Sequence, residues 1–210
     1  MWKPSPFLGM LVALIMTVLA AAADEATTSY TSDSSFQDDL MNVTIEYRVQ
    51  HNASKLEWNT TLSDYAQDLA DGCKFEHSGG PYGENLGSGY GSAELTVTAW
   101  GNESTNYDFK AGEFSEETGH FTQLVWKSTT SMGCGRKECN GGTSGGEGDA
   151  PGWFVVCEYW PRGNVVGQFK ENVQSTPQQD AESKAPSTAI GKVLYVWVGL
   201  VTGWMVAVWL

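Results

Sequence analysis

The chain has 210 residues and a formal net charge of −13, with 25 acidic residues against 12 Lys and Arg. This balance argues against nucleic-acid binding, because phosphate contacts depend on Lys and Arg. It also disfavours attraction to anionic membrane surfaces. Once the two apolar ends are set aside, about one domain's worth of chain remains.

The first 23 residues have the pattern of a secretory signal peptide. Lys3 precedes an apolar run over 7–19, and small residues lead up to Asp24, which is the order typical of such signals. A membrane anchor is the alternative, and it is disfavoured because the run is shorter than the ~20 residues that span a bilayer. We expect cleavage after Ala23, a flexible segment over 24–35, and a secreted, extracellular protein.

A second apolar segment covers 193–210 and contains no charged residue. The linker ahead of it, 173–192, is polar and rich in Ser, Gln, Ala and Pro. A polar spacer before an apolar tail predicts a signal for a glycosylphosphatidylinositol (GPI) anchor, with Ser183 as the attachment residue. The alternative is a single membrane-spanning anchor, which lacks a basic cytoplasmic flank here. Both put the protein at the cell surface or cell wall, held to a membrane by its C-terminal part.

Four cysteines lie between the two ends, and an even number in a secreted chain predicts two disulfides. A zinc site is disfavoured because Cys134 and Cys139 have no second close pair. The spacing alone leaves three pairings open. Four Asn-x-Ser/Thr sequences also predict a glycosylated surface, and their acceptor residues are Asn42, Asn52, Asn59 and Asn102.

The first half of the chain is predicted to be helical. Residues 36–51 carry apolar side chains at helical spacing, namely Phe36, Leu40, Val43 and Tyr47. Further helices are expected over 58–73 and 93–102, and a short helix or helix-like turn over 119–128. The Gly- and Ser-rich stretch 77–91 and the stretch 107–117 are expected to be loops.

The second half is predicted to form strands. Residues 132–136 and 153–159 flank a Gly-rich insertion over 140–152, which is typical of a hairpin with a long loop. A last strand is expected over 165–169. Helices early and strands late predict an α+β domain.

Three segments carry a resemblance to a known family. They are His77–Leu86 (HSGGPYGENL), Gly119–Thr129 (GHFTQLVWKST) and Phe154–Gly167 (FVVCEYWPRGNVVG). In these segments the chain resembles the CAP superfamily (cysteine-rich secretory proteins, antigen five, pathogenesis-related class one), and most of all its fungal secreted branch. The resemblance covers 36–172 and implies a three-layer α-β-α sandwich with an antiparallel sheet late in the chain.

Two positions depart from the family pattern. Thr44 and Ile45 stand where many relatives have His-Asn, and Glu158 stands where Asn or Ser is commoner. Neither position is expected to belong to the central site. The family's disulfide pattern implies that Cys134 pairs with Cys157 and that Cys73 pairs with Cys139.

The resemblance also implies a functional cleft that holds two histidines and two glutamates. Their counterparts in this chain are His77, Glu84, Glu103 and His120. Imidazoles suit Zn²⁺, and carboxylates can complete or orient such a site, so we expect a cleft able to bind Zn²⁺ or Mg²⁺, with no organic cofactor. The same groups could perform acid–base chemistry. The third histidine, His51, is expected to be structural or solvent-facing.

Three aromatic residues lie in the stretch that follows the third predicted helix. The spacing of Tyr107, Phe109 and Phe114 resembles the caveolin-binding-type loop of sterol-binding fungal relatives. Aromatic faces can cover a flat apolar ring system. The alternative is that these rings pin the loop onto the core of the domain. The resemblance favours lipid contact.

The favoured function is therefore non-enzymatic binding of sterols or fatty acids in an apolar pocket. One alternative is a protease or esterase that uses the four-residue cleft, either with a bound metal or with a nearby serine such as Ser128. It is disfavoured because the chain has no nucleophile-elbow pattern and no His-Glu-x-x-His sequence. The other alternative is an extracellular effector whose acidic, glycosylated face binds a host-surface or cell-wall component.

Overall fold

The computed structural model describes residues 29–139 and 148–176. The predicted signal peptide, Ser183 and the apolar tail over 193–210 lie outside these ranges. Among the described residues, no helix is both long enough and apolar enough to cross a membrane.

The domain is built around one four-stranded sheet. Its strands are β1 (Glu57–Trp58), β2 (Gly83–Ser88), β3 (Ser131–Glu138) and β4 (Trp153–Trp160), in the order β1-β3-β4-β2. The β3–β4 and β2–β4 pairs are antiparallel, whereas the two-residue β1 runs parallel to β3. The predicted hairpin is therefore confirmed, and both of its strands are longer than expected.

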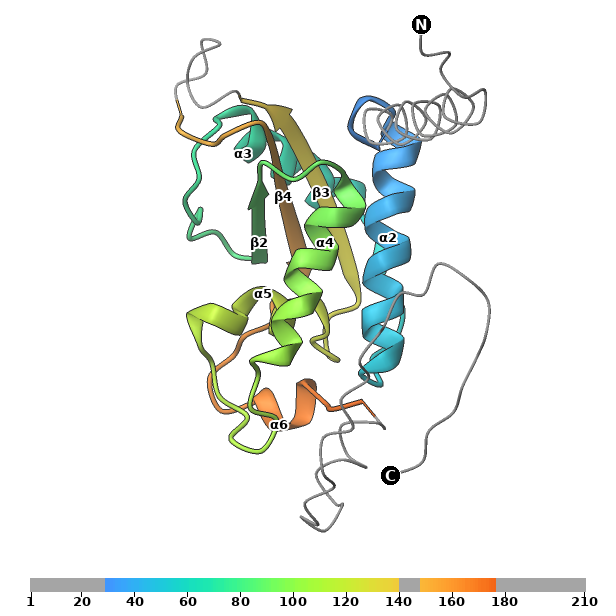
Figure 1. Cartoon of the computed structure of the whole chain (residues 1–210), viewed down its shortest axis with the longest axis vertical. Helices are drawn as coiled ribbons and strands as arrows, with labels where there is room; N and C mark the ends of the chain where they lie inside the picture. Colours follow the sequence, from blue (N-terminus) through green and yellow to red (C-terminus); the bar gives the residue numbers. More distant parts are fainter. Residues whose placement is uncertain (1–28, 140–147, 177–210) are drawn as a thin grey trace, which may run out of the picture.

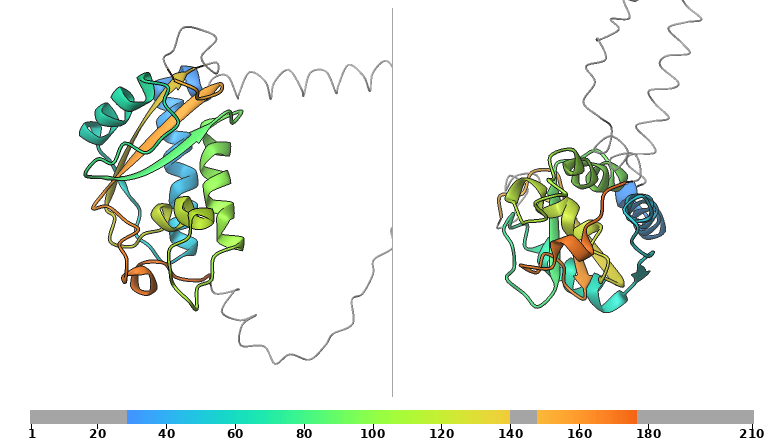
Figure 2. Two further views of the ribbon diagram at one scale, coloured as in Figure 1. Left: turned by 90° about the vertical axis from the view of Figure 1, so that its left-hand side faces the viewer. Right: turned by 90° about the horizontal axis from the view of Figure 1, so that it is seen from below.

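Helices cover both faces of this sheet. They are α2 (Asp33–Gln50), α3 (Thr60–Asp71), α4 (Ala93–Asn102), α5 (Gly119–Leu124) and α6 (Phe169–Asn172), with short 3₁₀ turns η1 (Glu103–Thr105) and η2 (Glu116–Thr118). Figures 1 and 2 show α3 on one face of the sheet and α2 and α4 on the other. The predicted α+β fold with three α-β-α layers is confirmed. The turns η1 and η2 and the helices α5 and α6 gather at one end of the sandwich (Figure 1).

The helix α2 buries a different stripe from the one that its apolar residues suggest. Its most buried positions are Phe36, Leu40, Thr44 and Arg48, each four residues after the last. The Arg48 guanidinium donates hydrogen bonds to four backbone carbonyls, those of Ser54, Leu124, Trp126 and Thr129. Burial lowers the pKa of Arg48 to about 10. This cation therefore fixes α2 to the chain that follows α5.

The helix α3 lies very close to the sheet. A Cβ atom at Gly133 would lie 2.3 Å from the backbone nitrogen of Ser63, and one at Gly135 would lie 2.3 Å from the backbone of Gln67. Two glycines on β3 therefore allow the helix backbone to rest directly on the strand. The Asn59 side chain caps this helix by accepting hydrogen bonds from the backbone N–H groups of Thr61 and Leu62.

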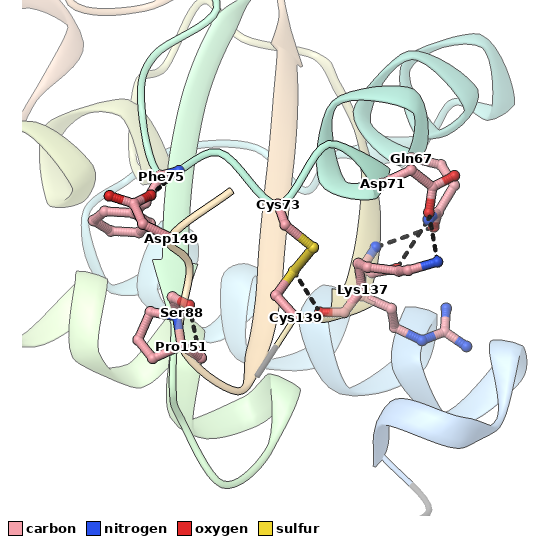
Figure 3. The surroundings of a disulfide bond; sticks show 10 residues. Gln67, Asp71, Cys73, Phe75, Ser88, Lys137, Cys139, Asp149 and Pro151 are labelled. Atoms are coloured by element: carbon pink, nitrogen blue, oxygen red, sulfur yellow. Dashed lines mark hydrogen bonds and ion pairs between the residues drawn. A yellow bond between two sulfur atoms is a disulfide. The ribbon is translucent and has the colours of Figure 1, made fainter. Parts of the chain in front are cut away.

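Both predicted disulfides are confirmed. Cys134 pairs with Cys157 across the β3–β4 hairpin, and Cys73 pairs with Cys139. Figure 3 shows the second bond joining the chain that follows α3 to the chain that follows β3. Next to it, Asp149 accepts a hydrogen bond from the backbone N–H of Phe75.

Four element predictions need correction. The segment 24–35 is not a loose segment where it is described, because Tyr30 is only 2% exposed and stacks on Trp153, and α2 begins at Asp33. Trp58 belongs to β1 rather than to the second helix. The expected loop 77–91 contains β2, and the expected strand 165–169 is a turn that leads into α6.

Candidate functional site

One histidine–glutamate pair lies where α4 and α5 meet. His120 is in the first turn of α5, and its Nδ1 lies 2.6 Å from Oε1 of Glu103 in the turn η1. The other oxygen of Glu103 accepts the backbone N–H of Phe121 at 3.0 Å. The His120 ring also stacks on Trp100 of α4, with 6.0 Å between ring centroids. The carboxylate and the indole together fix the orientation of this imidazole.

The second pair lies at the open edge of the sheet. Glu84 is on the edge strand β2, and its Oε1 lies 2.6 Å from Nδ1 of His77 and 3.0 Å from the backbone nitrogen of Ser78. The hydrogen bond with Glu84 raises the pKa of His77. Burial acts to raise the pKa of Glu84, but its hydrogen bonds with His77 and Ser78 outweigh this, and the pKa of Glu84 is lowered. His77 itself is exposed.

A third carboxyl group lies beside Glu84. It was not expected to belong to the site. Glu158 on β4 stands directly opposite Glu84 in the β2–β4 register, and it is 1% exposed. Burial, followed by the charge of Glu84 and a hydrogen bond with it, raises the pKa of Glu158 to about 9. Glu158 is therefore protonated at neutral pH. Only its departure from the family pattern marked this position in the sequence.

The two pairs face a common cleft. Asn85 donates a hydrogen bond from its side chain to the backbone carbonyl of His120 at 3.0 Å, which connects β2 to α5. A cavity of about 400 Å³ is lined by His77, Glu84 and His120 together. A second cavity, of about 410 Å³, shares His77, Glu84, Phe114 and Asn164 with the first. The four predicted residues thus form two hydrogen-bonded pairs, and three of the four line one two-lobed cleft.

The arrangement does not form a four-ligand metal site. Among the described residues, no group of three or more His, Cys, Asp and Glu side chains is placed to hold a metal ion. Each glutamate instead bonds Nδ1 of its histidine, which is the supporting role that carboxylates have behind metal-binding imidazoles. Two Nε2 atoms remain, fewer than the three protein ligands of a catalytic zinc site.

A family model described as the cysteine-rich secretory protein family, CAP, matches residues 41–159. The chain belongs to the CAP family. The match contains both histidine–glutamate pairs and all four cysteines. It also contains Glu158, so the third carboxyl group lies inside the family domain.

Relatives of this CAP chain include fungal proteins. It is 46% identical over 144 residues to protein PRY2 of Saccharomyces cerevisiae, covering 66% of this chain and 41% of that protein. It is 37% identical over 145 residues to secreted protein PRY1 of Candida albicans, covering 67% of this chain and 33% of that protein. The chain therefore spans less than half the length of these two relatives. The Candida albicans relative is named as a secreted protein, and this name together with the two disulfides supports an extracellular location.

The fold of the CAP domain also occurs among solved structures. Venom allergen-like protein 4 of Schistosoma mansoni superposes with a TM-score of 0.52 at 22% identity, covering 67% of this chain and 95% of that one. This likeness supports the architecture of helices on both faces of a four-stranded sheet.

The three aromatic residues of the predicted lipid loop divide into two groups. Tyr107 is 7% exposed, and Phe109 packs against Tyr107, Phe121 and His51. These two rings pin the loop to the core of the CAP domain, as the alternative interpretation expected. Phe114 is 51% exposed and lines both lobes of the cleft. This packing gives lipid contact by Tyr107 and Phe109 no support, and the lipid role expected of the three rings stays a prediction.

His51 is structural, as the sequence suggested, and it is buried rather than solvent-facing. Its ring stacks on Phe109 and meets Phe121 edge to face. Its Nδ1 lies 2.5 Å from the backbone carbonyl of Gln174, and burial lowers its pKa. This side chain joins the end of α2, the aromatic loop and the chain that leaves the CAP domain.

The serine considered as a nucleophile is not placed for that role. The Ser128 hydroxyl donates to Oδ1 of Asn172 at 2.7 Å, and Ser128 lines neither lobe of the cleft. Nucleophilic catalysis needs a hydrogen bond between the nucleophile and its base. The geometry around Ser128 therefore gives the hydrolase hypothesis no support.

Three of the four predicted glycan acceptors are exposed, and they lie on three different parts of the surface. Asn42 lies on α2, Asn52 follows α2, and Asn102 ends α4. Asn59 is half-buried, but its helix cap uses Oδ1 and leaves the amide nitrogen unused by the cap. Glycosylation at these residues stays a prediction.

Proposed function

We propose that this CAP-domain protein binds a lipid, a sterol or a fatty acid, in the cleft beside the two histidine–glutamate pairs, and that it does so without catalysis. The observation that carries the proposal is the exposed ring of Phe114, which borders both lobes of the cleft. Each lobe, at about 410 and 400 Å³, has the size of a small-molecule site.

The lining of the cleft suits an amphipathic ligand. Phe114, Tyr82 and Val166 contribute apolar surface, and Val166 is 88% exposed. Glu84, His77 and Asn164 contribute polar groups within the same cavity. Small-molecule sites combine mostly apolar walls with a few polar groups that orient the ligand, and this mixture fits a lipid with a polar end.

Acid–base chemistry is the second use to which the cleft could be put. Both imidazoles are oriented by carboxylates, which is how general bases are held. The missing part is a nucleophile, because Ser128 is bonded elsewhere. We therefore rank binding above hydrolysis.

We also propose that the protein is held at the cell surface. An extracellular protein whose segment 193–210 is apolar and uncharged would be held at the cell surface by a GPI anchor attached at Ser183. Release of the native protein from cells by a phosphatidylinositol-specific phospholipase tests this. Protein that stays with the membrane after such treatment contradicts it.

Equilibrium binding of labelled cholesterol and labelled palmitate to the purified secreted protein tests the lipid proposal. We expect saturable binding of at least one ligand, and Phe114→Ala should weaken it by about tenfold, because a buried aromatic contact is worth ~1.5 kcal/mol or more.

Leu95→Ala provides the matched control. Leu95 is 52% exposed, close to the 51% of Phe114, but it lies on α4 and lines neither lobe of the cleft. Its removal should leave the affinity unchanged. Absence of saturable binding of either lipid by the unaltered protein would refute the proposal, and equal losses in the two variants would move the site away from this cleft.

A further inference from the structure

The described chain leaves the domain beside the loop that carries Phe114. Nδ1 of His51 lies 2.5 Å from the backbone carbonyl of Gln174, and the Asn52 side chain donates a hydrogen bond to Oε1 of Gln174 at 2.8 Å. The His51 ring stacks on Phe109, which belongs to the same loop as Phe114. The exit of the chain is therefore fixed to the end of the sandwich where this loop and α6 lie (Figure 1).

The segments 107–117 and 162–170 form one continuous surface at this end, which we call the α6 face. The Phe114 ring contacts Phe169, with 6.3 Å between the ring centroids. Figure 2 shows the loop after α4 and the helix α6 next to each other when the molecule is seen from below. The loop is thus packed against α6, and its exposed residues share a surface with those of α6.

The α6 face exposes apolar side chains at the cleft. Val166 is 88% exposed, which is the largest exposed fraction of any large apolar side chain in the described residues, and Phe114 is 51% exposed. Both line the larger lobe, so the cleft reaches the surface here. Exposed apolar residues that border a ligand cleft and have polar neighbours are typical of an interaction site.

The charges of the α6 face nearly balance. Its two segments together contain four Asp and Glu and three Lys and Arg, in a chain with a net charge of −13. Attraction to anionic lipids depends on a cluster of Lys and Arg, and this face has no such excess. Its partner is therefore a surface with little net charge, to which apolar contact contributes most of the affinity.

The proposed anchor would bring this face to a membrane. Ser183 lies seven positions after residue 176, the last described residue. Seven residues span at most ~25 Å when they are fully extended. A domain held at Ser183 would therefore keep the end from which its chain leaves closest to the lipid. The start of α4, at the opposite end of the sandwich (Figure 1), would lie furthest from it.

We propose that the α6 face docks on a bilayer of zwitterionic or uncharged lipids, with Val166 and Phe114 inserted among the headgroups. Apolar side chains at a protein surface bind membranes in proportion to the apolar area that they bury. Docking in this way places the cleft at the bilayer, so that a lipid passes between the two without crossing water. The inference rests on lipid binding as the proposed function and on the anchor at Ser183, and it identifies the membrane as the partner of the cleft.

Hydrogen exchange of the native anchored protein in phosphatidylcholine vesicles tests this contact without any substitution. The comparison is the same protein after release by a phosphatidylinositol-specific phospholipase. The peptides 110–116 and 163–168 should exchange more slowly in the anchored protein, because lipid excludes water from them. The peptide 90–96, at the opposite end, is the internal control and should exchange equally in both. Equal exchange in all three peptides would overturn the docking.

Flotation of the purified secreted protein with phosphatidylcholine vesicles tests the docking independently of the anchor. Val166→Glu should weaken the binding by about tenfold or more, because the apolar side chain no longer enters the lipid. Leu95→Glu is the matched control, since Leu95 is 52% exposed on α4, and it should bind as the unaltered protein does. Phosphatidylserine in the vesicles should not strengthen the binding of any of these proteins.

Gln168→Leu tests the face without touching the cleft. Gln168 is exposed just before α6 and lines neither lobe. The added apolar side chain should strengthen binding to phosphatidylcholine vesicles by about tenfold. The affinity for palmitate in solution should stay unchanged.

The outcomes separate docking from lipid binding. A protein that binds palmitate or cholesterol in solution, but does not float with the vesicles or floats equally well as Val166→Glu, overturns the docking and leaves the proposed function standing. Stronger flotation with phosphatidylserine also overturns it, because that result indicates electrostatic attraction. Flotation of a protein that takes up neither lipid refutes the proposed function, while the docking itself stands.

Discussion

Glu158 is a carboxylic acid in the interior of the sheet. It is 1% exposed, it faces Glu84 across the β2–β4 pair, and its Oε1 has no hydrogen-bond partner among the described residues. Its pKa rises from 4.5 to about 9, first because of burial and then because of Glu84. The proton on Glu158 lets two adjacent carboxyl groups share one negative charge instead of carrying two.

This environment predicts a pH-dependent cost in stability. The folded chain keeps the Glu158 proton while the unfolded chain loses it above pH 4.5, so the free energy of unfolding falls as pH rises from about 4.5 to about 9. Glu158→Gln supplies a neutral side chain with a permanent donor. We expect it to raise the free energy of unfolding by ~1 kcal/mol or more at pH 8 and by less at pH 5.

Urea unfolding of both proteins at the two pH values measures this difference. Comparison with the unaltered protein cancels the other titrating groups, including His77. A gain that is the same at pH 5 and at pH 8 would show that Glu158 is ionised in the folded protein.

Individual residues of the site were predictable to different degrees. The four His and Glu residues were found through the family signatures around them, and no local spacing in the sequence would have paired them. The two pairs come together because β2 and α5 meet through the hydrogen bond from the Asn85 side chain to the His120 backbone carbonyl. Glu158 was missed as a site residue because burial, which raises its pKa, is a property of the folded sheet and not of the local sequence.

Among the single elements, α3 and β3 pack backbone against backbone at Gly133 and Gly135. Gly135→Ala should lower the free energy of unfolding by about 3 kcal/mol, because the new methyl group would meet helix backbone that cannot move aside as a side chain could. The measurement is urea unfolding at pH 7.

Gly91→Ala is the control for this prediction. A Cβ at Gly91 would lie 3.6 Å from a side-chain methyl group of Leu95, which is ordinary contact. This variant should be as stable as the parent. Equal stability of the Gly135 and Gly91 variants would contradict the close packing of α3 on β3.

Elements with a clear period were predicted, and elements without one were not. The helix over 93–102 and the β3–β4 hairpin follow from the apolar residues and the Gly-rich insertion between the strands, and the short helix expected over 119–128 ends at Leu124. The strand β2 was not predicted, because Gly83 and Gly87 interrupt the sequence pattern that is typical of a strand. The segment 165–169 has the apolar residues of a strand, but it pairs with no strand of the described sheet and forms a turn that leads into α6.

The aromatic loop shows why composition alone could not assign its role. Tyr107 and Phe109 both pack against Phe121, which lies 14 and 12 positions later in the chain. Phe109 also stacks on His51, which lies well before the loop. Phe114 comes five residues after Phe109 and stays exposed at the cleft. The same loop therefore serves packing with its first two rings and offers only its last ring to a ligand.

At the scale of the whole molecule, the Cys73–Cys139 bond ties the helical half of the chain to the sheet. The two cysteines are 66 positions apart, so the bond removes much conformational freedom from the unfolded chain. Replacing both by Ala should lower the free energy of unfolding by about 4 kcal/mol. Denaturant unfolding of the secreted protein measures this, and a loss below ~1 kcal/mol would show that the bond hardly restricts the unfolded chain.

On the scale of the whole molecule, the chain has a formal net charge of −13, and its described part contains a cleft bordered by the exposed ring of Phe114. We propose that this cleft holds a lipid. Native mass spectrometry of the protein purified from culture medium, before and after incubation with palmitate and with cholesterol, tests this most directly. We predict one lipid bound per protein, reduced by Phe114→Ala and retained by Leu95→Ala. A protein that emerges lipid-free and takes up neither compound would contradict the account.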